Sequence, residues 1–154
     1  MQTEISLGPQ PLNNGRKKSS ASELSARGCV VEDGYIAGDE CERLLESIKD
    51  HLTRTPAAEI NRPAPGRPLI YSVIDGRQIN AGLPEIVNLY ERVRTDLKLL
   101  WDGELVPLDD DRAACNINIT KPGGMYRWHY DRNLITAILY LNGVTGGETE
   151  CYPE

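Results

Sequence analysis

A histidine and an aspartate, His129 and Asp131, stand two residues apart and are the side chains of this chain best suited to chemistry. On a β-strand, side chains at this spacing point to the same face of the sheet. An imidazole nitrogen and a carboxylate oxygen held side by side can bind one metal ion. The bare triplet has a simpler interpretation, a surface histidine satisfied by a neighbouring carboxylate, so the surrounding sequence has to decide between the two.

The residues around this pair predict consecutive strands. The triplet follows a glycine-rich turn at Pro122-Gly123-Gly124, and a strongly apolar segment, Ile135 to Leu141, comes a few residues later. Apolar and polar residues also alternate upstream of the turn. We expect strands over residues 113–120, 125–131, 134–141 and 147–152. The second half of the chain is therefore predicted to be mainly β-sheet.

The first half of the chain predicts two amphipathic helices. The first should have Asp39 as its N-cap, with Glu42 as the partner in a capping box, and should continue to Leu52. The second should begin at Pro84, because proline is favoured at the first position of a helix, and should end at Asp102-Gly103. This order, with helices before strands, is typical of an α+β protein.

Turn and loop signals divide the rest of the first half. The prolines within residues 55–68 predict a loop. Residues 70–79 predict a β-hairpin with a tight turn at Asp75-Gly76. Residues 1–27 are polar and lack apolar periodicity, so we expect a disordered tail. One domain should then span residues 28–154.

Composition excludes several classes of protein. The net charge of −6 over 154 residues argues against nucleic acid as a general partner. No apolar stretch approaches the roughly 20 residues of a membrane span, and the N-terminus lacks the apolar segment of a secretory signal. The four cysteines are widely spaced and form no Cys-x-x-Cys pair, which favours reduced thiols. We therefore expect a cytoplasmic protein.

The chain resembles the catalytic domain of the prolyl 4-hydroxylase-like enzymes, a branch of the iron(II)/2-oxoglutarate-dependent dioxygenases. The resemblance is carried by Lys121 to Asp131, Ile135 to Asn142 and Gly146 to Thr149. The segment from Val31 to Ile36, with the helix that follows it, is also similar to the usual opening of this family. The resemblance implies an α+β fold in which N-terminal helices pack on a double-stranded β-helix (jelly-roll) core.

The same resemblance implies an Fe(II)- and 2-oxoglutarate-dependent oxygenase, which hydroxylates its substrate while 2-oxoglutarate is decarboxylated to succinate. His129 and Asp131 match the first two ligands of the family's 2-His-1-carboxylate iron site. Tyr140 matches a tyrosine whose hydroxyl helps to bind the distal carboxylate of 2-oxoglutarate, and Tyr126 matches a tyrosine that lines the site. Packing in the sheet is the alternative role for either tyrosine. The substrate would be a small molecule or a peptidyl group, and ascorbate is a candidate reductant.

Two departures from the family pattern bear on the site. Thr120-Lys121 stands where many relatives carry a tyrosine before the Pro-Gly turn, so one cosubstrate contact differs. The family takes its second histidine, and then a basic residue, from strands that would follow Glu154. We therefore expect a partial jelly-roll domain, whose unfinished sheet would tend to self-associate. His51, in the first predicted helix, is not expected to replace the missing ligand.

The sequence leaves three interpretations open. The first is an active oxygenase, and the second is a non-catalytic, truncated oxygenase fold that binds metal weakly. The third is a zinc hydrolase, which requires three protein ligands and an activated water. The sequence offers two ligands, His129 and Asp131, and no evident general base, which disfavours the third interpretation.

Overall fold

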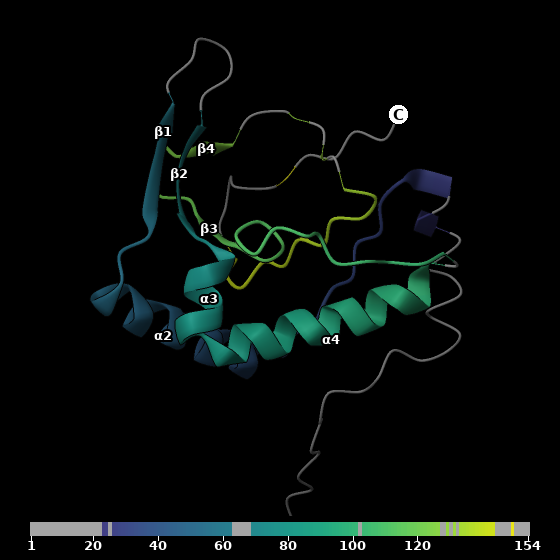
Figure 1. Ribbon diagram of the computed structural model, residues 1–154, viewed down its shortest axis with the longest axis horizontal. Coiled ribbons are helices and arrows are strands. Elements are labelled where there is room, and N and C mark those ends of the chain that lie inside the picture. The colour runs from purple at the N-terminus through teal and green to yellow at the C-terminus, as the bar shows by residue number, and fades with distance from the viewer. Residues whose placement is uncertain are drawn as a thin grey trace, which may run out of the picture.

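The computed structural model of this chain describes residues 23–24, 26–62, 69–101, 103–126, 129, 131, 133–143 and 149, and every structural statement below concerns these residues. They form a mixed structure of helices and a small antiparallel sheet, as the α+β prediction required (Figure 1). Of the expected tail, residues 1–22 and 25 lie outside the described part, and residues 23–24 and 26–27 are helical.

The sheet is built around β2 (Leu69–Ile74), whose sequence of β-branched and aromatic residues favours a strand. β1 (Ala58–Arg62) pairs with β2 antiparallel along one side. The other side of β2 is shared by β3 (Ile117–Ile119), opposite its C-terminal half, and β4 (Met125–Tyr126), opposite its first two residues. β4 therefore lies at the N-terminal end of β2.

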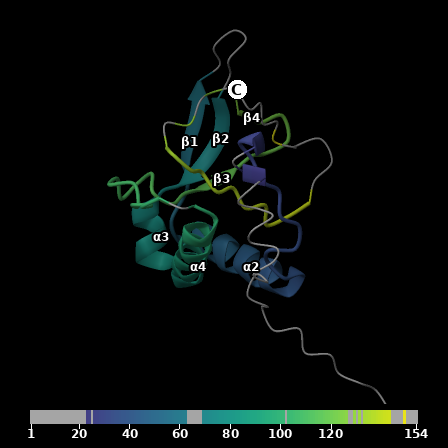
Figure 2. The same ribbon diagram turned by 90° about the vertical axis from the view of Figure 1, so that its right-hand side faces the viewer.

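Three helices are named in the described part: α2 (Gly38–Arg54), α3 (Gly76–Gly82) and α4 (Pro84–Leu100). They gather at the end of the sheet where β2 runs into α3 (Figures 1 and 2). α4 begins at Pro84, as predicted.

In the part of the chain that the structure describes, no helix is both long and apolar enough to cross a membrane.

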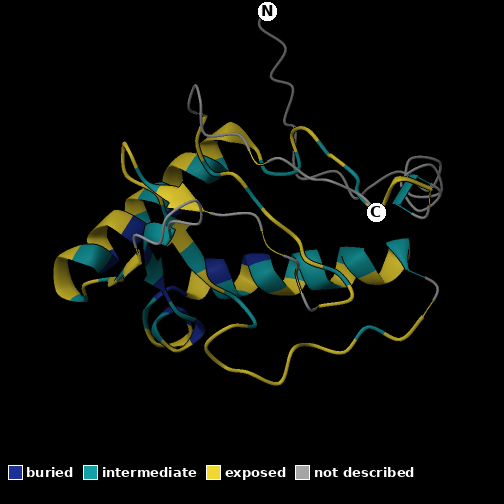
Figure 3. Cartoon of the chain, turned by 90° about the horizontal axis from the view of Figure 1, so that it is seen from above, coloured by how far each residue is buried: buried dark blue, intermediate teal, exposed yellow. Residues whose placement is uncertain are grey.

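The core lies where the helices meet this end of the sheet (Figure 3). Its buried apolar side chains come from α2, β2, α3, the residue after α3, and α4. They are Leu44, Ile48, Ile74, Ile79, Leu83, Ile86 and Leu89. Burial of these aliphatic side chains, at about 1.5–3 kcal/mol each, is the main force that holds the helices on the sheet.

The structure corrects the predicted hairpin over residues 70–79. Asp75-Gly76 is the start of α3, since the Asp75 carboxylate accepts a hydrogen bond from the backbone nitrogen of Gln78 at 3.0 Å. The Gln78 side chain in turn accepts one from the backbone nitrogen of Asp75 at 3.2 Å. This reciprocal capping box favours the helix over a two-residue turn. Glycine fits at position 76 because a Cβ there would lie 2.3 Å from the carbonyl oxygen of Asp111.

Two further local predictions were wrong. The loop predicted over residues 55–68 contains β1, which gains its backbone hydrogen bonds from β2, a partner that local sequence does not reveal. The N-cap of α2 is Ala37 and not Asp39, and no side chain caps this helix end. Asp39 instead pairs with Arg43 at 2.7 Å, one turn along the exposed face of the helix.

The predicted strands of the second half are shorter than expected or are not formed. β3 covers three residues of 113–120, because the Asp110 side chain holds the backbone nitrogens of Arg112 and Ala113 in a turn. Residues 135–140 form no strand. Leu139 packs against the core, whereas Ile138 is 58% exposed. Apolar residues favour a strand, but a strand also needs a partner at hydrogen-bonding distance. The strand predicted at 147–152 lies outside the described residues, apart from Thr149.

Candidate metal site

The structure brings the two predicted metal ligands together. Nε2 of His129 lies 3.0 Å from Oδ1 of Asp131. The two side chains remain 44% and 40% exposed, so an ion from solvent can reach them. Both residues follow β4, which ends at Tyr126; the strand predicted over 125–131 is seen only in its first two residues. The pair is therefore held close to the sheet, but it is not shown to be part of a strand.

The separation of the two donor atoms suits a metal ion. Nitrogen and carboxylate ligands lie about 2.1 Å from a divalent metal. Two such donors at neighbouring corners of an octahedron are then about 3 Å apart, as Nε2 and Oδ1 are. The same separation also suits a direct hydrogen bond from the imidazole of His129 to the carboxylate of Asp131. The geometry of the pair thus fits both interpretations that the sequence left open.

Tyr126 contacts the imidazole of His129. The centroids of the two rings are 4.9 Å apart and their planes are tilted by 59°. A second tyrosine, Tyr71 of β2, lies against Tyr126 with a centroid distance of 4.8 Å and a tilt of 48°. Tyr71 was not among the site residues predicted from sequence. The alternation of β2 was the available signal, because it places Tyr71 on the sheet face opposite to that of the buried Ser72 and Ile74.

The structure describes two donors at this site and no full ligand set. No group of three His, Cys, Asp or Glu side chains able to hold an ion is found among the described residues. The chain has two histidines, and the second, His51, lies elsewhere. It is 4% exposed in α2 and packs against Gly82 at the end of α3. α3 follows the C-terminal end of β2, whereas β4 pairs with the N-terminal end, so the two histidines belong to opposite ends of that strand.

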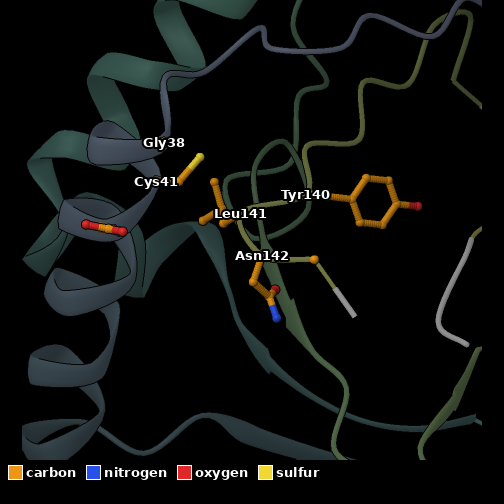
Figure 4. Close-up of a pocket in the computed structure, with 7 residues that line it drawn as sticks. Gly38, Cys41, Tyr140, Leu141 and Asn142 are labelled. Atoms are coloured by element: carbon orange, nitrogen blue, oxygen red, sulfur yellow. The ribbon is translucent and has the colours of Figure 1, made fainter. Parts of the chain in front are cut away.

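Tyr140, the predicted cosubstrate ligand, lies on the surface. Its side chain is 58% exposed, and its hydroxyl donates a hydrogen bond to the side-chain oxygen of Thr149. Figure 4 shows the ring directed away from α2, whereas the neighbouring Leu141 points toward Cys41. Tyr140, Leu141 and Cys41 are among the residues that line a cavity of about 470 Å³ against the first turn of α2. Neither His129 nor Asp131 is among the residues that line this cavity, and the cosubstrate role of Tyr140 stays a prediction.

The described cysteines are free thiols, which agrees with the prediction of reduced cysteines. They are Cys29, Cys41 and Cys115. Burial raises the pKa of the Cys115 thiol, because an apolar environment disfavours the thiolate. Cys115 packs against the core and is therefore a structural residue and a poor nucleophile.

Comparison with known proteins gives no further assignment. No family model, no curated protein and no solved structure matches this chain.

Proposed function

We propose that this chain is an Fe(II)- and 2-oxoglutarate-dependent oxygenase that binds its metal through His129 and Asp131. The single observation that carries the proposal is the 3.0 Å separation of His129 Nε2 and Asp131 Oδ1. It supports the proposal because the spacing of the two residues in the sequence predicts a metal pair, and the distance between the two donor atoms matches that of neighbouring ligands on an octahedral ion. The resemblance of Lys121 to Asp131 to the prolyl 4-hydroxylase-like enzymes supplies the choice of metal and cosubstrate.

The proposed fold is a partial double-stranded β-helix. β1 to β4 would belong to one sheet of the roll, and α2, α3 and α4 would cover it at one end. The outer edge of β1 has no strand partner among the described residues, so the sheet can accept another strand. Self-association through this edge is part of the proposal, and sedimentation velocity at increasing protein concentration would detect it.

In the proposed mechanism, His129 and Asp131 would hold the ion and would leave its remaining positions open for solvent and cosubstrate. Bound iron with 2-oxoglutarate supplies oxygen activation coupled to decarboxylation to succinate. The ring of Tyr126 covers one side of the imidazole, which limits the orientations His129 can adopt. The negative carboxylate of Asp131 would offset part of the positive charge of the ion, and its partial exposure leaves room for substrate to approach.

A second function, metal binding without turnover, is favoured by one observation. The described residues contain no third ligand beside the pair. Two protein ligands fix less of the coordination sphere than three, so the bound ion would be held weakly and its open positions would be filled by water. This function predicts metal binding without 2-oxoglutarate-dependent release of succinate.

Metal titration tests the proposal directly. Cobalt(II), a spectroscopic substitute for iron(II), should bind the full chain weakly, and His129→Ala and Asp131→Ala should each abolish that binding. Asp39→Ala is the matched control, because Asp39 is an exposed carboxylate on α2 that makes only a local ion pair. Identical isotherms for wild type, His129→Ala and Asp131→Ala would remove the pair from any metal site. Succinate release with iron(II), 2-oxoglutarate and ascorbate then separates the catalytic function from simple metal binding.

A further inference from the structure

Three aromatic rings from separate segments form a row that ends at the proposed metal ligand. Tyr71 comes from β2, Tyr126 from β4 and His129 from the segment after β4. The centroids are 4.8 Å apart for Tyr71 and Tyr126, and 4.9 Å apart for Tyr126 and His129. Both contacts are tilted, and both centroid distances lie in the range of favourable aromatic pairs. We call these three residues the aromatic row.

The pairing of β4 with β2 creates the row. In the register of these strands, Tyr126 lies opposite Leu69, and Tyr71 is two residues further along β2 on the same face. Cross-strand neighbours on one face are close enough for aromatic side chains to meet. Gly124 permits this close approach, since a Cβ at that position would lie 2.8 Å from the carbonyl oxygen of Ile70 and 2.7 Å from Cγ2 of Thr120.

We propose that Tyr71 is a positioning residue for the metal pair. It acts through Tyr126, whose ring it holds against the imidazole of His129, so that Nε2 stays directed at Asp131. A ring packed against the imidazole reduces the number of rotamers that His129 can adopt, so that a metal has fewer to select among. Tyr71 touches neither substrate nor metal in this role. The inference deepens the proposed function and rests on it, because the ion is the ligand that the positioned pair would take.

The expected effect follows from the strength of one aromatic contact. Removing the Tyr71 ring should weaken cobalt(II) binding on the order of three- to tenfold. Tyr71→Leu is the informative variant, because it keeps an apolar side chain in β2 and removes only the ring. Tyr71→Phe keeps the ring and should bind cobalt(II) within about twofold of wild type, since the hydroxyl has no part in the row.

Ile60→Ala is the matched control. Ile60 is the cross-strand partner of Tyr71 on β1, so its truncation loosens the same region of the sheet without removing a ring. It should change thermal stability and leave cobalt(II) affinity unaltered. A general loss of sheet packing would instead weaken binding in Ile60→Ala and Tyr71→Leu alike, and that result would overturn the positioning role.

A metal-free readout keeps this inference separable from the proposed function. The ring-proton signals of His129 in the nuclear magnetic resonance spectrum are identified by their loss in His129→Ala. They should shift in Tyr71→Leu, because Tyr126 moves relative to the imidazole, and should stay in place in Tyr71→Phe and Ile60→Ala. Unchanged His129 signals in Tyr71→Leu would show that Tyr71 does not position His129 through Tyr126. This conclusion would hold whether or not the protein binds cobalt(II). Absence of cobalt(II) binding by wild type, with the signals shifted as expected, would instead overturn the proposed function and with it the role of Tyr71 toward an ion.

Discussion

His51 and Gly82 are packed so closely that the glycine leaves no room for a side chain. A Cβ at position 82 would lie 2.8 Å from Nδ1 and 2.9 Å from Cε1 of His51. His51 is buried in α2, and Nε2, fully enclosed, has no hydrogen-bond partner among the described residues. The imidazole therefore packs directly against the backbone of α3 at this glycine. This contact fixes how closely the two helices approach.

Gly82→Ala should consequently destabilise the protein by about 1–3 kcal/mol, the usual effect of overpacking in a core. Helix propensity alone predicts the opposite sign, because alanine is the better helix former. Gly38→Ala is the matched control, since a Cβ at the start of α2 meets nothing within 4 Å. Urea unfolding measures both variants. A Gly82→Ala protein as stable as wild type would show that the imidazole has space that the structure does not indicate.

The capping box of α3 gives a second stability prediction. Asp75→Ala should destabilise the protein by about 1 kcal/mol, because the first turn of α3 loses the carboxylate that accepts the Gln78 backbone hydrogen bond. Asp39→Ala should have little effect, since Asp39 caps no helix end and makes only an exposed ion pair with Arg43. The shift in urea midpoint of the two variants can be compared directly. A larger shift for Asp39→Ala would restore it as the helix cap that sequence alone predicts.

Tyr35 should make the stability depend on alkaline pH. Burial raises its pKa to about 12, and the hydrogen bond that its hydroxyl donates to Asp96 at 2.9 Å acts in the same direction. Because an unfolded tyrosine ionises near pH 10, the folded state favours the protonated form. This contribution to stability is complete below about pH 10 and is lost as the pH rises toward about 12. Partial exposure of the ring keeps the effect modest.

The measurement for Tyr35 is the ultraviolet absorbance of tyrosinate during a pH titration. Folded wild type should retain a late-titrating tyrosine that Tyr35→Phe lacks, and protein in urea should show no such component in either chain. The fall in unfolding free energy between pH 10 and 12 should also be shallower in Tyr35→Phe. Superimposable titrations of the two folded proteins would contradict the environment described for this hydroxyl.

Tyr140 is tested through cosubstrate binding. If its hydroxyl binds the distal carboxylate of 2-oxoglutarate, Tyr140→Phe should weaken metal-dependent binding on the order of tenfold or more, since a hydrogen bond to a charged group contributes about 1.5–3 kcal/mol. Isothermal calorimetry with cobalt(II) present gives the affinity. Tyr90→Phe, a change on α4, is the control and should bind as wild type does. An unchanged affinity in Tyr140→Phe would leave Tyr140 as a surface residue whose partner is Thr149.

Several features of this protein are determined by local sequence. The apolar periodicity placed α2 and α4 correctly. An amphipathic stripe can be recognised from the sequence of the helix alone, without knowledge of what it packs against. The proximity of His129 and Asp131 also follows from sequence, since two residues so close along the chain can meet whatever the rest of the fold does.

The tertiary structure decided everything that depends on a partner far along the chain. β1 exists because β2 lies beside it, and local composition had favoured a loop there. Asp75-Gly76 suits a hairpin turn and a helix start about equally; packing of Ile79 and Leu83 into the core stabilises the helix. The contact of Tyr71 with Tyr126 joins two strands through a register that neither strand specifies alone. The register of such strand pairs is determined by the burial of whole sheet faces. That burial energy depends on both strands and on the core, so the sequence of one segment does not reveal it.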